Sequence, residues 1–172
     1  MDAGDGAVMG PPGPERILAT LVAHGVDFLV IGGLAAVTHG SRRVTRDIDI
    51  VVRPESENLA RLEAALSELD AVQLLAGASE EPIEPSDIAM VALGTTLHTR
   101  SRAGRLDVVG APAGAAPYEH LRQRSVAGRI GDTDVRISGL DDLIAMKRAA
   151  GRPLDLQDIA DLTALDSAPP EE

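Results

Sequence analysis

The sequence has no cysteine, no tryptophan and only two aromatic residues, Phe28 and Tyr118. Without cysteine there is no disulfide framework and no thiolate metal site, which is typical of proteins from a reducing compartment. With 1% aromatic residues, the core has to be filled by Ala, Val, Leu and Ile. The same scarcity disfavours a site in which nucleic-acid bases stack on an aromatic platform.

Long hydrophobic runs are also missing. No apolar run approaches the roughly 18 residues of a membrane span, and the start lacks a basic region followed by an apolar stretch. We therefore predict a cytoplasmic protein without a membrane partner. The length of 172 residues, with 44% hydrophobic and 25% charged residues, is typical of one globular domain. Gly, Pro and acidic residues crowd both ends, so we predict a single domain over 14–165 between disordered tails at 1–13 and 166–172.

Basic residues are scarce overall but unevenly distributed. The net charge of −11 argues against a nucleic-acid partner, because phosphate backbones need basic surfaces. Residues 98–129, however, hold six arginines against only Asp107 and Glu119, and Arg42, Arg43 and Arg46 form a second basic group. A site for a nucleoside triphosphate, and for an RNA end, is therefore compatible with the charge pattern.

Hydrophobic periodicity predicts helices and strands that are mixed early in the chain, with helices gathered at its end. We expect helices over 14–24, 34–37, 54–69, 117–123, 139–150 and 156–165, strands over 26–31 and 47–52, and β-hairpins over 95–110 and 126–137. Segment 76–87 is a loop by composition. This order favours an α/β (α+β) fold, a mixed sheet with helices mainly on one side and C-terminal helices.

Asp47 and Asp49 are the centre of the candidate site. Alternate residues of a strand share one face roughly 6.5–7 Å apart, so both carboxylates project together while Ile48 and Ile50 enter the core. Such a pair can hold Mg²⁺ (or Mn²⁺) ions for in-line phosphoryl displacement, and oxygen is the ligand that Mg²⁺ prefers. Asp107 lies between Leu106 and Val108 in another predicted strand and offers a third carboxylate.

Gly32 and Gly33 end the first strand, thirteen residues before Asp47. Without side chains they would expose backbone N–H groups to a triphosphate. Arg43 and Arg46 lie near enough in sequence to neutralise phosphate oxygens. Lys147 falls on the apolar stripe of its helix and has no carboxylate three or four residues before it, so it is a further candidate for binding the triphosphate or the leaving pyrophosphate.

Other polar residues have structural interpretations that are at least as strong. Asp155 and Asp158 fit a helix N-cap with an acid in the first turn. His39 fits a local cap as well as a phosphate contact, and a surface position is favoured for His98 over one beside Asp107. Tyr118 is expected to serve packing.

The stretch VIGGLAAVTHGSRRVTRDIDIVV (30–52) resembles the DNA polymerase β-like nucleotidyltransferase superfamily, whose signature is hG[GS], nine to thirteen residues, then Dh[DE]h. Its Arg43–Asp49 portion is most similar to the AbiEii-type toxins of type IV toxin–antitoxin systems, and DLIAMKRAAGRPLDLQDIADL (142–162) is similar to their closing motif. The resemblance reaches from about Pro14 to Leu165. In one departure, Gly33 stands where many members have Ser.

The resemblance implies a polymerase β palm-like nucleotidyltransferase with Asp47, Asp49 and Asp107 as metal ligands and catalytic residues, and with a functional Asp155. It would move a nucleoside monophosphate from an NTP to a hydroxyl on an RNA 3′ end (a tRNA, for example), a protein or a small molecule. Its partner would be a cognate antitoxin. The alternatives are an antitoxin or binding module that covers a toxin protein, and an inactive nucleotide sensor. The three Asp residues favour the enzyme.

Overall fold

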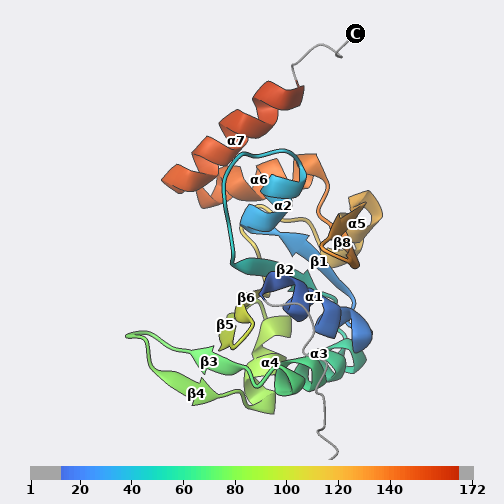
Figure 1. Ribbon diagram of the computed structural model, residues 1–172, viewed down its shortest axis with the longest axis vertical. Coiled ribbons are helices and arrows are strands. Elements are labelled where there is room, and N and C mark those ends of the chain that lie inside the picture. Colours follow the sequence, from blue (N-terminus) through green and yellow to red (C-terminus); the bar gives the residue numbers. More distant parts are fainter. Residues whose placement is uncertain (1–12, 167–172) are drawn as a thin grey trace, which may run out of the picture.

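The computed structural model describes residues 13–166. The predicted tails lie outside this range except for Gly13 and Asp166. Within it the chain forms seven helices and eight strands (Figure 1). They follow one another as α1 (Pro14–Ala23), β1 (Phe28–Ile31), α2 (Gly32–Thr38), β2 (Ile48–Val52), α3 (Ser56–Glu68), β3 (Val72–Leu74), β4 (Glu80–Pro82), α4 (Pro85–Ala92), β5 (Thr96–Ser101), β6 (Gly104–Val109), α5 (Tyr118–Arg124), β7 (Val126–Ile130), β8 (Thr133–Ile137), α6 (Leu140–Ala150) and α7 (Pro153–Asp166).

All eight described strands join one mixed sheet in the order β4-β3-β5-β6-β2-β1-β8-β7. The central strand β2 runs antiparallel to β1 and parallel to β6. Strand β1 also runs parallel to β8, which brings the C-terminal hairpin against the first strand. The predicted fold class, a mixed sheet with C-terminal helices, is confirmed.

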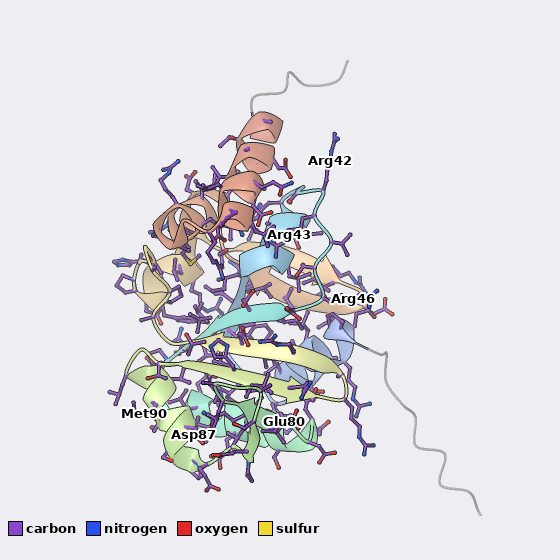
Figure 2. All side chains as sticks on the ribbon, turned by 90° about the vertical axis from the view of Figure 1, so that its left-hand side faces the viewer. Arg42, Arg43, Arg46, Glu80, Asp87 and Met90 are labelled. Atoms are coloured by element: carbon purple, nitrogen blue, oxygen red, sulfur yellow. The ribbon has the colours of Figure 1, made fainter. Side chains whose placement is uncertain are left out.

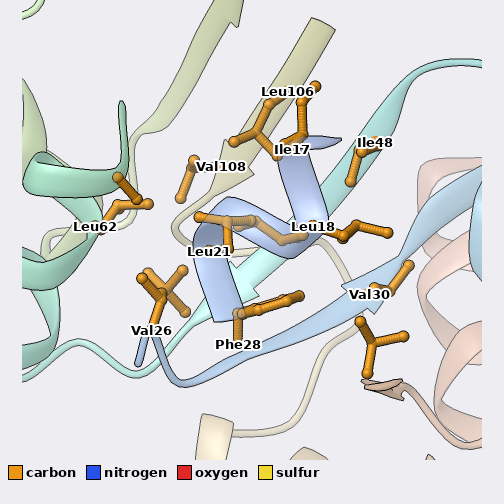
Figure 3. Close-up of a cluster of buried hydrophobic side chains, with 14 of the residues drawn as sticks. Ile17, Leu18, Leu21, Val26, Phe28, Val30, Ile48, Leu62, Leu106 and Val108 are labelled. Carbon is orange, nitrogen blue, oxygen red and sulfur yellow. The ribbon is translucent and has the colours of Figure 1, made fainter. Parts of the chain in front are cut away.

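Alternation along the strands divides the apolar residues between the two faces of the sheet. On one face, Ile48, Ile50 and the even-numbered residues of β1 join the larger core with α1, α3 and α4 (Figure 3). On the other, Leu29, Ile31 and Val51 meet Leu121 of α5 and Met146 of α6 in a smaller cluster. Aliphatic side chains make up nearly all of the larger core, as the composition predicts, with Phe28 as its aromatic member. The second face is less filled, and the polar residues of β2 and β6 project from it.

The prediction of a loop over 76–87 is wrong in part. Glu80–Pro82 forms β4, which pairs with β3, and α4 begins at Pro85. The helix start has a sequence signal: the Glu84 and Asp87 side chains form a capping box, and Pro85 occupies the first turn. The three-residue strands have no comparable signal, because β3 is held in the sheet by its pairing with β5 rather than by its own pattern.

Helix α7 also begins three residues earlier than predicted, at Pro153 rather than 156. Pro153 fits there because the first helical position needs no backbone N–H donor. Among residues 13–166, no helix has the length and apolar character to cross a membrane.

Candidate active site

Asp49 and Asp107 are direct neighbours across two parallel strands. Asp49 of β2 pairs in register with Asp107 of β6, on the face of the sheet that carries the smaller cluster. Asp49 is half-buried, and the side chain of Asp107 is 20% exposed. Asp47 precedes β2 and is exposed. The structure therefore brings two of the predicted carboxylates together and places the third at the start of the strand.

The electrostatics of this pair favour a cation. Burial is the main cause that raises the pKa of Asp49, followed by repulsion from Asp107; Arg152 opposes the rise and Asp47 adds to it. The buried Oδ1 atom of Asp107 has no hydrogen-bond partner in the described part of the chain. His98 Nδ1 lies 3.1 Å from that oxygen, without hydrogen-bond geometry. His98 therefore lies beside Asp107, against the favoured surface position, although its side chain is half exposed.

The donor set fits a hard divalent cation that binds together with a phosphate ligand. Within residues 13–166, no group of three or more acidic or histidine side chains is arranged to hold an ion by itself. Mg²⁺ does not need such a cage, since it commonly takes one or two carboxylates, several waters and substrate phosphates. Asp49 and Asp107, with the orphaned Oδ1 atom of Asp107, supply that partial set of oxygen ligands. Asp47 can join them.

Gly32 brings the backbone against the Asp49 carboxylate. Its φ of 67° is unfavourable for residues with a side chain, and an added Cβ atom would lie 2.3 Å from Asp49 Oδ2. Both the backbone conformation and the space therefore require glycine. The sequence interpretation assigned Gly32 to phosphate approach, and the structure places Gly32 beside the Asp49 carboxylate.

Arg43 and Arg46 differ in their relation to the site. Arg43 lies against α2 and lines a cavity with Gly33 and Asp49, whereas Arg42 and Arg46 extend away from the body (Figure 2). Arg46 is exposed and lines neither of the cavities next to the carboxylates.

Asp158 is fully buried and binds two of the three predicted phosphate-binding cations. Its Oδ2 atom lies 2.7 Å from Lys147 Nζ and 3.0 Å from Arg43 Nη1, and Ser41 Oγ donates to its Oδ1 at 3.3 Å. The expectation that Asp158 is the acid in the first turn of its helix is wrong, because α7 begins at Pro153 and Asp158 lies in its second turn. Lys147 therefore does have acidic partners; they come from α7 and not from its own helix.

Asp155 combines a cap with a place in the site. It is not the N-cap residue that the sequence interpretation expected, because α7 begins at Pro153 and Asp155 lies in its first turn. Its Oδ2 atom accepts from the backbone N–H of Arg152 at 3.2 Å, as an acid at the third helical position does in a capping box. It also accepts from Arg152 Nε at 2.7 Å, and its Oδ1 lies 3.7 Å from Lys147 Nζ. Burial acts to raise the pKa of Asp155, but the hydrogen bonds and charge of Arg152 outweigh it and lower the pKa.

Ser41 and Arg152 belong to the site although the sequence interpretation missed them. Ser41 is 5% exposed and reaches Asp158 across 117 positions of sequence, so no local pattern could have indicated the contact. Arg152 lines both cavities, and its position between Gly151 and Pro153 made it look like part of a connection between helices.

Two cavities meet at the carboxylate pair. One, of about 450 Å³, is polar and extends toward Gly33, Arg43 and Thr45. The other, of about 390 Å³, extends over the more apolar surface of Val109 and Pro112. The residues that line both are Gly32, Asp49, Asp107, Lys147, Arg152 and Asp155.

The other singled-out residues have local roles. His39 Nε2 lies 2.8 Å from the carbonyl oxygen of Ser138, so it ties α2 to the end of β8 rather than entering either cavity. Tyr118 donates its hydroxyl to Asp27 at 2.7 Å. Burial and this hydrogen bond raise the pKa of Tyr118 far above its ordinary value.

The mixed sheet, with its paired carboxylates beside a glycine turn, defines the class of protein as a nucleotidyltransferase. The chain belongs to the AbiEii family, the nucleotidyl transferase toxins of type IV toxin–antitoxin systems, whose family model matches residues 16–171. A comparison with curated proteins finds no match.

Solved structures show the same fold. ANT(2″)-Ia in complex with adenylyl-2″-tobramycin is similar at a TM-score of 0.53 and 19% identity, over 88% of this chain and 86% of that one. The solution structure of ANT(2″)-Ia, an antibiotic-resistance factor, gives a TM-score of 0.54 at 19% identity, over 90% and 82%. A Thermotoga maritima protein, provisionally assigned as a nucleotidyltransferase, has a TM-score of 0.49 at 14% identity, over 88% and 87%.

Proposed function

We propose that this protein transfers a nucleoside monophosphate from an NTP to an acceptor hydroxyl, releases pyrophosphate, and uses Mg²⁺ or Mn²⁺. The observation that carries the proposal is the in-register pairing of Asp49 with Asp107 next to the close backbone approach at Gly32. A divalent cation held by Asp49, Asp107 and Asp47 would polarise the phosphates and lower the pKa of the acceptor hydroxyl.

Other residues around the Asp49–Asp107 pair would bind the triphosphate and the leaving pyrophosphate. Gly32 and Gly33 admit the triphosphate, and Arg43 and Lys147 supply positive charge to its oxygens. Arg152 lines both cavities and can neutralise the negative charge of pyrophosphate as it leaves. Arg46, which lines neither cavity, is left out of this assignment.

In the proposed reaction, the acceptor oxygen forms a bond to the α-phosphorus of the NTP. The bond between the α-phosphorus and the oxygen that bridges to the β-phosphorus breaks, and pyrophosphate leaves with that electron pair. The hydroxyl proton would pass to the oxygen of the Asp107 carboxylate that does not bind the cation.

The acceptor is the open element of this proposal. Family membership favours an acceptor whose modification is toxic to the cell, such as a tRNA or other RNA 3′ end or a protein, and a cognate antitoxin as partner. The nucleotidyl adduct of an aminoglycoside in the ANT(2″)-Ia complex adds a small molecule to the acceptors worth testing.

The test uses each of the four NTPs labelled at the α-phosphate, with Mg²⁺ or Mn²⁺ and with total RNA, cell lysate or aminoglycosides as acceptor. Wild-type protein should label at least one acceptor. Asp107→Asn should lower transfer by about a hundredfold or more, the usual contribution of a proton acceptor, and keep most NTP affinity because Asp49 remains. Asp132→Asn, which changes a fully exposed acid far from the cavities, is the matched control.

Equal labelling by wild type and Asp107→Asn would remove the catalytic assignment. If neither protein labels any acceptor, and both bind and silence a toxin encoded beside them, the chain acts as an antitoxin instead.

A further inference from the structure

The space beside Gly33 is occupied by two side chains from the segment that joins α2 to β2. A Cβ atom on Gly33 would lie 2.8 Å from Arg43 Nη2 and 3.2 Å from Thr45 Oγ1. Gly33 does not have a positive φ, so its backbone conformation would accept a side chain. Glycine is required here because Arg43 and Thr45 already fill the volume that a side chain would take.

Thr45 therefore brings a hydroxyl to the place where a serine at position 33 would bring one. Its Oγ1 atom has a single weak bond within the described residues, at 3.5 Å to the carbonyl oxygen of Asp47. Thr45 is half-buried and lines the polar cavity together with Gly33 and Arg43. The hydroxyl is thus held in position yet remains able to donate to a ligand.

Arg43 is also held in position to donate hydrogen bonds to a ligand. Its Nη1 atom is bound to the buried carboxylate of Asp158, at 3.0 Å, and this fixes the guanidinium plane. The Nη2 atom faces Gly33 and makes no hydrogen bond to the described residues, and Arg43 lines the polar cavity. A fixed guanidinium beside a free hydroxyl is a suitable set of donors for phosphate oxygens.

The charges of the polar cavity define which phosphate would bind there. Asp49 lies against Gly32, where a divalent cation and the reacting α-phosphate belong under the proposed function. Arg43 and Thr45 lie against the next residue, Gly33, and line the same cavity. A triphosphate that extends from Asp49 past Gly33 would bring its terminal phosphate to Arg43 and Thr45.

We infer that Thr45 and Arg43 form the binding site for the terminal phosphate of the donor NTP, with the Thr45 hydroxyl in the place of a serine at position 33. This inference rests on the proposed function, since it takes the triphosphate to lie along this cavity. It makes Thr45 a specificity-determining residue that favours triphosphates over shorter phosphate chains.

The test measures binding of inorganic triphosphate and of pyrophosphate in the presence of Mg²⁺, by calorimetry, and so depends neither on the base nor on the acceptor. Thr45→Val keeps the shape of the side chain and removes its hydroxyl. It should weaken triphosphate binding by about tenfold or more, as expected for one hydrogen bond to a charged group, and leave pyrophosphate binding within about twofold. Thr45→Ser should retain wild-type affinity.

Two further variants test the same place. Thr45→Ala should lose affinity as Thr45→Val does. Gly33→Ser should also weaken triphosphate binding, because its Cβ would lie 2.8 Å from Arg43 Nη2 and displace the guanidinium. Thr38→Val, which changes an exposed threonine of α2, is the control.

Unchanged triphosphate affinity in Thr45→Val with a wild-type melting temperature would overturn the inference. The labelled-transfer assay separates this failure from that of the proposed function. If Asp107→Asn abolishes transfer while Thr45→Val leaves triphosphate binding intact, only the role of Thr45 is wrong.

Discussion

Asp49 shows how a residue of the site acts against the stability of the fold. Its carboxylate is enclosed by Gly32 and faces Asp107, and burial with this repulsion raises its pKa above the ordinary 3.8. The folded state therefore binds a proton at Asp49 more readily than the unfolded state does. The favourable contribution of Asp49 to the free energy of unfolding is fully present below pH 3.8. It is lost as the pH rises through the pKa of Asp49 in the folded state.

Asp49→Asn should consequently raise the melting temperature of the metal-free protein near neutral pH, because the uncharged amide removes the repulsion. The advantage should shrink as the pH falls toward 3.8, where wild-type Asp49 is itself protonated. Thermal melts in a chelator, over a pH series, measure this difference, with Asp132→Asn as the exposed control. A variant that is less stable than wild type at neutral pH would contradict the pKa argument. Mg²⁺ with an NTP should reverse the order by stabilising wild type alone.

Among the site residues, those in local patterns could be predicted and those joined across the fold could not. Asp49, Asp107 and Gly32 follow from strand alternation and from their apolar neighbours, which depend on short sequence spacing. Asp158 meets Arg43 across 115 positions, and neither the helix pattern of α7 nor the basic segment contains information on the other. The N-cap pattern around Asp158 even favoured the wrong role, because the helix begins earlier, at Pro153.

At the scale of elements, the contact of α6 with α7 is held by a buried charge cluster. Lys147 of α6 and Asp158 of α7 are 4% and 1% exposed and lie 2.7 Å apart. Breaking a buried pair leaves one charge without its partner, which costs far more than an exposed ion pair contributes. This cluster fastens α7 to α6, so under the proposed function stability and phosphate binding would depend on the same lysine.

Lys147→Met should lower the free energy of unfolding by about 3–5 kcal/mol, because Asp158 would stay buried with only Arg43 as a charged partner. Adding Asp158→Leu should recover part of this loss, since both charges are then gone. Urea unfolding of the two single variants and the double variant gives the coupling energy. The adjacent Arg148→Met changes an exposed cation and should shift stability by less than about 0.5 kcal/mol. Equal effects of Lys147→Met and Arg148→Met would show that the cluster is not structural.

The elements themselves were predictable where they were long or strongly patterned. The helices α1, α3 and α6, the strands β1 and β2, and both predicted hairpins lie close to their expected ranges. The error falls on 72–92, where β3 is held by its pairing with β5 and β4 by its pairing with β3. The sequence of such strands need not show period-two alternation, because pairing rather than burial stabilises them.

At the scale of the whole molecule, the site depends on both ends of the described chain at once. Strand β8 lies beside β1 in the sheet, and the side chains of α7 complete a cavity that begins at Gly32. Tyr118 of α5 reaches Asp27, 91 positions earlier, and its ring lies 5.7 Å below the Arg53 guanidinium.

Because early and late elements of the described chain share one sheet and one cavity, we predict that residues 14–165 unfold as one cooperative unit. The chain offers a clean probe, since Tyr118 is its only tyrosine and there is no tryptophan. Tyrosine fluorescence reports the junction of α5 with the start of β1, whereas far-ultraviolet circular dichroism reports the helices as a whole. In urea both signals should follow one transition with the same midpoint, as small single domains do. A fluorescence change that precedes the loss of helix would show that α5 and its junction open separately, and the single-domain prediction would then be wrong. Inorganic triphosphate with Mg²⁺ should shift both midpoints together, because under the proposed function it binds in the cavity that Gly32, Gly33 and α7 line together.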